Sequence, residues 1–184
     1  MTQRQVIQFY GTSSEYGCFS NFAHYPMRLQ GQTWPTTEHY FQAQKFPGSE
    51  HQDTIRLAKT PAKAKSLGRS RKFKLRRDWE SVKDEIMREA VLAKFTQHED
   101  IRAILLATGD AAIVEHTAND DYWGDGGDGH GKNKLGQILM AVREELRKAN
   151  QPPSAPPRRA TKAGPTHAAG PCRDGYRGSG PSHR

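Results

Sequence analysis

The clearest hydrophobic pattern lies in the segment 132–148, where apolar residues recur at intervals of three and four along the chain. This spacing places them on one face of an α-helix and predicts a helix that packs into a core. A second stripe of the same kind predicts a long helix from Asp78, which can cap its first turn, to about Phe95. The first stripe consists of Leu135, Ile138, Leu139, Val142 and Leu146, and the second of Val82, Ile86, Ala90 and Val91.

Shorter patterns define the other elements. Glycine and proline positions favour three further helices, over 51–58, 61–67 and 99–106. Short apolar runs predict a strand over 6–9 and a hairpin of 27–29 with 32–34, while 112–115 is either a strand or a helix end. We therefore expect a predominantly α-helical α+β single domain with a small N-terminal β element.

The segment 34–46 combines a helical pattern with reactive side chains. Glu38, Gln42 and Lys45 are spaced by four and three residues, so a short helix would present them in a row on one face. A carboxyl can move protons and an amine can attack carbon, which makes this row a candidate active site. The opposite side carries the core anchors Tyr40, Ala43 and Phe46.

The alternative interpretation of this row is a solvated helix surface, where Glu and Lys are most often found. The surrounding residues favour an enclosed row, because large aromatic side chains are crowded around it. They are Trp34, Tyr40, Phe41 and Phe46.

Composition divides the chain of 184 residues into two parts. We expect one domain over 1–150, followed by a disordered basic Pro/Gly/Ala-rich tail over 151–184. The tail has no Leu, Ile, Val, Phe, Met or Trp, and holds six basic residues against one acidic. It either contacts a polyanion such as nucleic acid or only solubilises the chain.

The positions of the cysteines and histidines argue against disulfide bonds and metal sites. Cys18 and Cys172 are single residues far apart in the chain and form no disulfide or zinc pattern. The histidines show no HExxH spacing, so we expect no metal and no cofactor. No apolar h-region or membrane-length apolar run is present in the sequence, so a cytoplasmic location without membrane contact is the default. Oligomeric state is not indicated.

A strongly basic segment extends from Arg56 to Arg77, with ten basic residues and no acidic one. Such a patch attracts phosphates, and an arginine such as Arg69 can bind them through two nitrogens. The alternative is a solvated charged face.

The glycine-rich segment 121–133 runs directly into the last predicted helix. It superficially matches dinucleotide, Walker and calcium loops, but each match lacks a required part: a preceding strand, a Ser/Thr and a bidentate Glu. Trp123 could instead stack on a flat base, while Gly124, Gly126 and Asn133 could bring backbone close to a ligand at the helix start. A plain surface loop is the alternative.

Several motifs together resemble the NADAR family and, within it, the YbiA-like N-glycosidases, over about residues 6–148. Thr37 stands where the family usually has Ser. The resembling segments are Phe9-Tyr10, Phe19-Ser20-Asn21-Phe22, Trp34 to Phe46, Arg76-Arg77-Asp78-Trp79, Tyr122-Trp123-Gly124-Asp125-Gly126 and Asn133-Lys134-Leu135-Gly136.

The resemblance implies hydrolysis of an N-glycosidic bond between a nucleobase-like ring and a ribose phosphate. Two substrate kinds are implied, early riboflavin-pathway intermediates of the 5-amino-6-ribosylaminouracil phosphate type and ADP-ribose joined to guanine in nucleic acid. The first is our preferred expectation, and a non-catalytic module that binds ADP-ribose or NAD is a third possibility. A complete Glu38/Lys45 pair favours an enzyme over such a module.

The expected site follows from the row and from the resemblance. Glu38 would exchange a proton with the base or the ribose ring oxygen, and Lys45 would attack C1′ to form a Schiff base, with direct water attack as the alternative. Asp125 would position water or bind ribose hydroxyls. The remaining expected substrate-binding residues are Ser20, Asn21, Phe22, Trp34, Gln42, Arg69, Trp79, Trp123, Gly124, Gly126 and Asn133.

Overall fold

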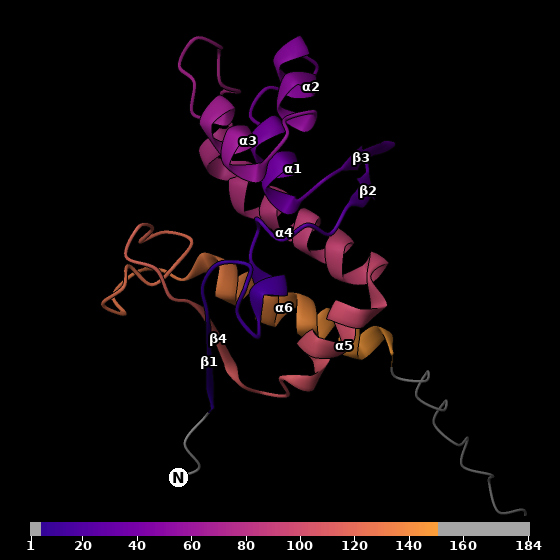
Figure 1. Ribbon diagram of the computed structural model, residues 1–184, viewed down its shortest axis with the longest axis vertical. Helices are drawn as coiled ribbons and strands as arrows, with labels where there is room; N and C mark the ends of the chain where they lie inside the picture. The colour runs from indigo at the N-terminus through magenta and orange to yellow at the C-terminus, as the bar shows by residue number, and fades with distance from the viewer. Residues whose placement is uncertain (1–4, 151–184) are drawn as a thin grey trace, which may run out of the picture. The chain divides into compact units, whose positions relative to one another are not determined.

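The computed structural model describes residues 5–150, and Figure 1 shows how their elements are arranged. The tail predicted over 151–184 lies outside the described residues. Within them the helices are α1 (Thr37–Ala43), α2 (Glu50–Arg56), α3 (Pro61–Gly68), α4 (Trp79–Gln97), α5 (Glu99–Ala107) and α6 (Lys134–Ala149). The strands are β1 (Val6–Phe9), β2 (Met27–Leu29), β3 (Gln32–Trp34) and β4 (Ala112–Glu115), and a 3₁₀ turn, η1, spans Gly17–Phe19. The predicted α+β class with mainly helical content is confirmed.

The strands form two small pairs. β2 and β3 make the predicted antiparallel hairpin, whose turn residues Gln30 and Gly31 have φ values of 51° and 76°. β1 pairs in parallel with β4, with Ile7 opposite Ile113, so the segment 112–115 is a strand. This strand follows α5 in the chain, whereas the other three strands lie within residues 6–34, where the N-terminal β element was expected.

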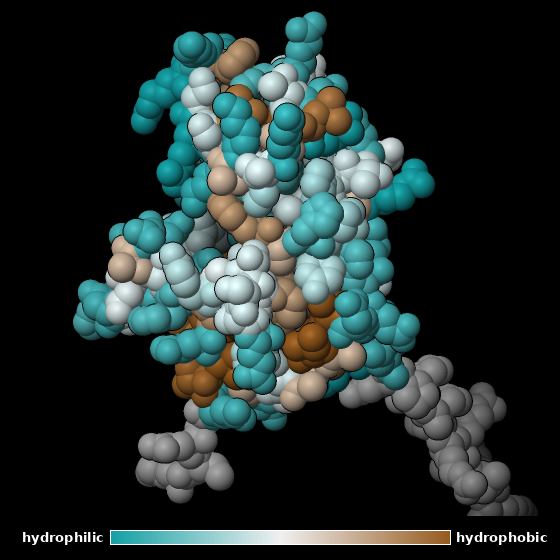
Figure 2. All heavy atoms as spheres, in the orientation of Figure 1, coloured by the Kyte–Doolittle hydropathy of each residue, from teal (hydrophilic) through white to brown (hydrophobic). Residues whose placement is uncertain are grey.

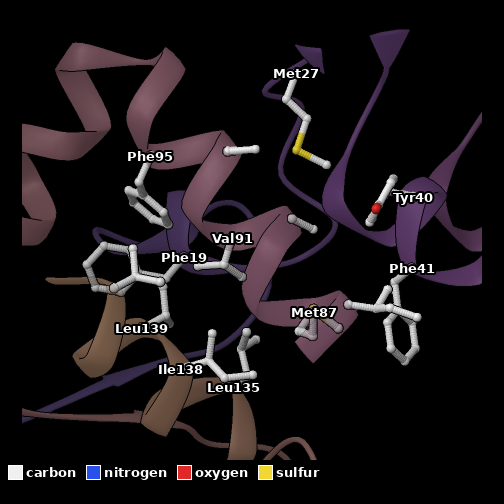
Figure 3. Close-up of a cluster of buried hydrophobic side chains, with 14 of the residues drawn as sticks. Phe19, Met27, Tyr40, Phe41, Met87, Val91, Phe95, Leu135, Ile138 and Leu139 are labelled. Carbon is white, nitrogen blue, oxygen red and sulfur yellow. The ribbon is translucent and has the colours of Figure 1, made fainter. Parts of the chain in front are cut away.

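The long helix α4 organises the other elements. In Figure 1, α1, α2 and α3 gather near one end of α4, while α5 and α6 pack against other parts of it and the β1–β4 pair lies beside α6. The core between α4 and α6 contains the residues of the two predicted stripes, and Figure 3 shows Val91, Phe95 and Leu139 pointing into it. Leu139 is fully buried, and truncating such a side chain to alanine typically costs about 2–5 kcal/mol.

One predicted helix end and one predicted capping bond were wrong. α1 ends at Ala43, so Lys45 lies in the turn that follows the helix rather than on its surface. Asp78 makes no side-chain cap for α4, because its carboxylate binds Arg76 through two hydrogen bonds of 2.7 and 2.8 Å. The strong ion pair outcompetes the weaker capping bond.

The surface is largely polar on the face drawn in Figure 2, where the hydrophobic residues form separate patches. Two exposed aromatic or aliphatic side chains, Phe73 and Leu75, belong to the basic segment between α3 and α4. None of the helices among the described residues has the length and apolar content needed to cross a membrane.

Candidate active site

One cavity collects residues that are far apart in the sequence. It has a volume of about 270 Å³ and is walled by α1, α3, the start of α4, the turn after η1 and the loop after β4. The predicted residues that line it are Ser20, Asn21, Phe22, Glu38, Gln42, Lys45, Arg69, Trp79 and Trp123. Five predicted residues do not line it, namely Trp34, Gly124, Asp125, Gly126 and Asn133.

The start of α1 fixes the position of Glu38. Thr36 lies in an extended conformation before the helix, and its Oγ1 accepts a 3.3 Å hydrogen bond from His39 N, which caps the first turn. One turn later, Gln42 Nε2 donates a 2.8 Å hydrogen bond to Glu38 Oε1. Glu38 is 5% exposed and Gln42 4% exposed, so this pair is almost enclosed.

The protonation of Glu38 reflects this enclosure. Burial raises the pKa of its carboxyl, because the charged form loses its hydration. The hydrogen bond from Gln42 and the positive charges of Lys65, Lys45 and Arg69 oppose the rise. The result is a carboxyl that holds a proton more readily than an ordinary glutamate.

The amine of Lys45 enters the same cavity from the turn after α1. Its Nζ donates to Gly68 O over 3.4 Å and lies 5.3 Å from the centre of the Trp79 ring. Burial lowers the pKa of Lys45, Glu38 opposes this, and the Arg69 charge adds to the lowering. At a given pH, a larger fraction of Lys45 is therefore in the free-amine form than of an exposed lysine.

Close packing of α3 against α1 allows Gln42 to lie beside Glu38. Gly68, the last residue of α3, lies against Gln42, and a Cβ at Gly68 would meet Gln42 Oε1 at 2.1 Å. Only a residue without a side chain leaves Gln42 in place beside Glu38. Gln42 Oε1 is buried there without a hydrogen-bond partner among the described residues.

The turn after η1 forms a second wall and is pinned to α1. Glu38 N donates to Asn21 O over 3.1 Å, and Thr37 Oγ1 donates to the same carbonyl over 3.0 Å. From behind, the buried Lys94 Nζ donates to Ser20 O over 3.0 Å. These bonds hold the Ser20–Phe22 segment against the cavity.

The glycine-rich loop supplies the aromatic side of the cavity. Trp123 packs edge-to-face on Phe41, with ring centres 5.2 Å apart, and Tyr122 lies beside it. Asp120 Oδ1 accepts hydrogen bonds from Tyr122 N and Trp123 N, which orients both aromatic residues. The predicted stacking role of Trp123 is compatible with this position.

Asp125 is turned toward its own loop. Its Oδ1 accepts from Thr117 N over 3.1 Å and from Gly127 N over 2.9 Å, and its Oδ2 lies 2.8 Å from His116 Nδ1. The His116 contact is the main cause that lowers the pKa of Asp125, so it is a stable carboxylate. This geometry fits a residue that shapes the loop.

Gly124, Gly126 and Asn133 also shape this loop. A Cβ on Gly124 would meet Glu115 O at 2.9 Å, and Gly126 has a φ of 74°. Asn133 accepts from Glu115 N over 3.0 Å and donates to Ile113 O over 2.9 Å, which ties the loop to β4. Asn133 has a φ of 47° and precedes α6, so that helix begins two residues later than expected.

The first backbone N–H groups of α6 are not open to an anion, contrary to the expectation. Lys134 N donates to Tyr122 O and Leu135 N donates to Trp123 O, both over 3.1 Å. These N–H groups at the start of α6 thus bind backbone carbonyls of the preceding loop.

Trp34 lies in the core rather than on the cavity wall. It is 2% exposed, its Nε1 donates to Leu29 O over 3.0 Å, and it packs edge-to-face on Tyr40. Of the three tryptophans expected to bind substrate, two therefore line the cavity, Trp79 and Trp123.

Sequence reasoning missed several lining residues, of which Glu115 is the most informative. Glu115 ends β4, and burial together with the nearby Asp120 raises its pKa to about 7. Ligands gather at the ends of parallel strands, but the parallel pairing of β4 with β1 is not visible in the sequence around residue 115. Lys65 on α3 and Lys83 on α4 also line the cavity.

The assembled groups define the chemistry that the cavity can perform. Glu38 can carry a proton, Lys45 can offer an amine, and the aromatic rings of Phe41, Trp79 and Trp123 can hold a flat ring. Basic side chains around the cavity favour a phosphorylated ligand. No cluster of three or more potential metal-binding side chains occurs among residues 5–150.

Several known proteins are similar to this chain in sequence. N-glycosidase YbiA of Escherichia coli is 56% identical over 144 residues, covering 78% of this chain and 90% of that protein. N-glycosidase Npun_R5314 of Nostoc punctiforme is 51% identical over 145 residues, covering 77% and 93%, respectively. Riboflavin biosynthesis protein VVA0006 of Vibrio vulnificus is 44% identical over 142 residues, covering 77% of this chain and 39% of that protein.

The structural match agrees with the sequence matches. The NMR structure of E. coli YbiA superposes with a TM-score of 0.75 at 53% identity, covering 82% of this chain and 91% of that one. The NADAR domain model matches residues 8–147, which include every residue of the cavity. The resemblance inferred from the motifs is thus confirmed, and the chain belongs to the NADAR family.

Proposed function

We propose that this protein is an N-glycosidase that hydrolyses the bond between a nucleobase-like ring and a ribose phosphate. The observation that carries the proposal is the convergence of Glu38 and Lys45 in one cavity, with pKa shifts that bring both toward neutrality. The names of the YbiA and Npun_R5314 relatives support the reaction class.

The preferred substrate is an early riboflavin-pathway intermediate of the 5-amino-6-ribosylaminouracil phosphate type. The riboflavin name of the Vibrio vulnificus relative supports this choice. A cavity of about 270 Å³ with aromatic walls suits a single flat ring and a ribose.

The chemistry divides between two residues. Protonated Glu38 gives its proton to the nitrogen that joins the base to C1′, or to the ribose ring oxygen, which weakens the C1′–N bond. The free amine of Lys45 attacks C1′, the C1′–N bond breaks, and the base leaves with the proton from Glu38. The C1′–O4′ bond then opens as a proton passes from Nζ to the ring oxygen, and the adduct becomes a protonated Schiff base between Nζ and C1′. Water then adds to C1′, the C1′–Nζ bond breaks, and ribose phosphate leaves with the amine restored.

Two variants and one trapping experiment test this mechanism. Lys45→Ala should reduce turnover by several orders of magnitude, while Lys63→Ala, at an exposed position of α3, should retain it. Borohydride with substrate should attach one reduced sugar to wild-type enzyme and none to Lys45→Ala. Turnover without any trapped adduct would favour direct attack by water guided by Glu38.

A second candidate is removal of ADP-ribose from guanine in nucleic acid. It is favoured by a cavity of about 580 Å³ that adjoins Lys45 and contains Arg69 and Arg71, which leaves room for a longer phosphorylated substituent. A turnover panel of phosphoribosylaminopyrimidines and ADP-ribosylated guanine DNA, with free sugar measured, separates the two candidates. Binding of ADP-ribose without turnover of any substrate would favour a non-catalytic binding module.

The proposed domain limits and the tail require their own test. We propose that residues 1–150 suffice for the reaction. Deletion of 151–184 should leave turnover of the small substrate unchanged. A loss confined to nucleic-acid substrates would assign the tail to polymer binding.

A further inference from the structure

Two further cavities adjoin the catalytic cavity on different sides. The first, here the basic cavity, has a volume of about 580 Å³ and shares Lys45, Arg69 and Trp79 with the catalytic cavity. The second, here the acidic cavity, has a volume of about 280 Å³ and shares Glu115, Asp120 and three other residues with it. The catalytic cavity thus lies between two extensions.

The two extensions differ in charge. The basic cavity contains Arg71 in addition to Lys45 and Arg69, against the single acidic residue Glu80. The acidic cavity contains the carboxyls of Glu115 and Asp120 against the single cation Lys65. A ligand that spans the site therefore meets positive charge at one end and negative charge at the other.

The two ends favour different hydrogen-bonding groups. Guanidinium groups only donate, and they bind phosphate oxygens in pairs. Ionised carboxyls only accept, and therefore suit a ring that carries amino groups. The ring of Phe22, which lines the acidic cavity, offers a face for such a flat ring.

Resting on the proposed function, we infer that the substrate binds in one direction, with its phosphate in the basic cavity and its amino-bearing ring in the acidic cavity. Arg69 and Arg71 bind the phosphate, and Glu115 selects the ring through its amino groups. C1′ then falls between the ends, where Glu38 and Lys45 lie. The reverse direction places a phosphate against two carboxyls and leaves the guanidinium groups without an anion.

The environment of Glu115 strengthens its role as the selecting residue. It is partly buried, and burial together with Asp120 raises its pKa to about 7. Above this pH its carboxyl is mainly ionised and accepts hydrogen bonds from the amino groups of a pyrimidine.

The test measures binding of the two halves of the substrate to the full chain by calorimetry. Ribose 5-phosphate probes the basic cavity, and 5,6-diaminouracil probes the acidic cavity. Arg71→Gln should weaken the binding of ribose 5-phosphate at least tenfold and change the affinity for diaminouracil by less than twofold. Glu115→Gln should weaken the binding of diaminouracil at least tenfold and change the affinity for ribose 5-phosphate by less than twofold. The matched controls Lys72→Gln and Asp121→Asn, at exposed positions outside these cavities, should change neither.

The inference is overturned if both variants weaken both ligands alike, if their effects are exchanged, or if the wild-type chain binds neither ligand. Should Glu115→Gln fail to fold, Asn119→Arg at an exposed position of the acidic cavity should weaken diaminouracil alone. These measurements involve no turnover, so they test the inference separately from the proposed function. If the two variants show the expected pattern of binding but the chain hydrolyses no substrate, the inference is retained and the proposed function is rejected. If the chain hydrolyses the substrate but the variants do not show this pattern, the proposed function is retained and the inference is rejected.

Discussion

Gln42 donates a hydrogen bond of 2.8 Å to Glu38 across one turn of α1. The donor is an amide that cannot lose its proton, so the bond favours the ionised carboxyl over the protonated one. Burial acts in the opposite direction and is the larger effect. The amide therefore limits how far the Glu38 pKa rises.

Replacing Gln42 by leucine removes this limit. The acid limb of the pH profile of kcat/KM should move to higher pH by about one unit or more, because a hydrogen bond to a charged group contributes roughly 1.5–3 kcal/mol. At low pH kcat/KM should not fall, because Glu38 is already protonated there. Gln44→Leu is the matched control, since Gln44 is buried to a similar degree but does not line the cavity. An unchanged acid limb in Gln42→Leu would show that Glu38 does not control it.

The wild-type enzyme should show a bell-shaped dependence of kcat/KM on pH. The active form of the Glu38/Lys45 pair carries one proton, because the amine must be free and the acid protonated. Burial raises the pKa of Glu38 and lowers that of Lys45, so the acid limb lies above that of an ordinary carboxyl and the basic limb below that of an ordinary lysine. Steady-state kinetics between pH 4 and about pH 11 checks this; a basic limb at the position of an exposed lysine would contradict the burial argument.

Gly68→Ala tests the contact between α3 and α1. The new methyl group would lie 2.1 Å from Gln42 Oε1 and 2.7 Å from Gln42 Cβ, so Gln42 must move away from Glu38. Overpacking of this kind typically costs about 1–3 kcal/mol of unfolding free energy, and turnover should fall by more than this loss of stability explains. Thermal unfolding and kcat of Gly68→Ala are compared with Ser66→Ala, an exposed position of the same helix where both should stay near wild type.

The sequence predicted those parts of the fold and site that depend on short-range pattern. The stripe from Leu135 to Leu146 is buried as expected, and Glu38 and Gln42 face the same cavity because helical spacing places them together. Lys45 reaches that cavity although α1 ends two residues before it, because the following turn keeps the same direction.

The parts that depend on contacts across the chain were not predicted. Glu115 enters the cavity because β4 pairs with β1 and α6 begins behind it, and no local pattern near residue 115 contains that information. Trp34 was placed in the cavity by its neighbours in sequence, but the β2–β3 hairpin turns its indole onto Tyr40. Residue type alone does not distinguish a stacking indole from a core indole.

Lys94 should make the stability of the protein depend on pH. Burial lowers its pKa from 10.5 to about 7, so between these values the unfolded chain holds a proton that the folded protein lacks. The unfolding free energy should therefore rise with pH across this window, by at most about 1.4 kcal/mol per pH unit. Lys94→Met should lack this slope and Lys72→Met should keep it, as measured by urea unfolding at several pH values. Equal slopes in all three proteins would show that Lys94 is protonated in the folded state.

Asp125 offers a test that separates a loop-shaping role from a direct catalytic one. In Asp125→Asn the remaining oxygen can still accept from Thr117 N and Gly127 N, whereas Asp125→Ala leaves both donors unpaired. If Asp125 shapes the loop that carries Trp123, the asparagine variant should retain most of kcat/KM. The alanine variant should lose about 1–3 kcal/mol of unfolding free energy and much of its activity.

A carboxylate that itself positions water or binds the ribose gives a different pattern. Both variants would then lose activity to a similar extent, because both remove the negative charge. Thermal unfolding together with kcat and KM for the wild type and the two variants distinguishes these outcomes. Both carboxylate oxygens contact groups of the loop itself, namely Thr117, Gly127 and His116. We therefore expect the pattern of a loop-shaping residue, in which the asparagine variant stays active.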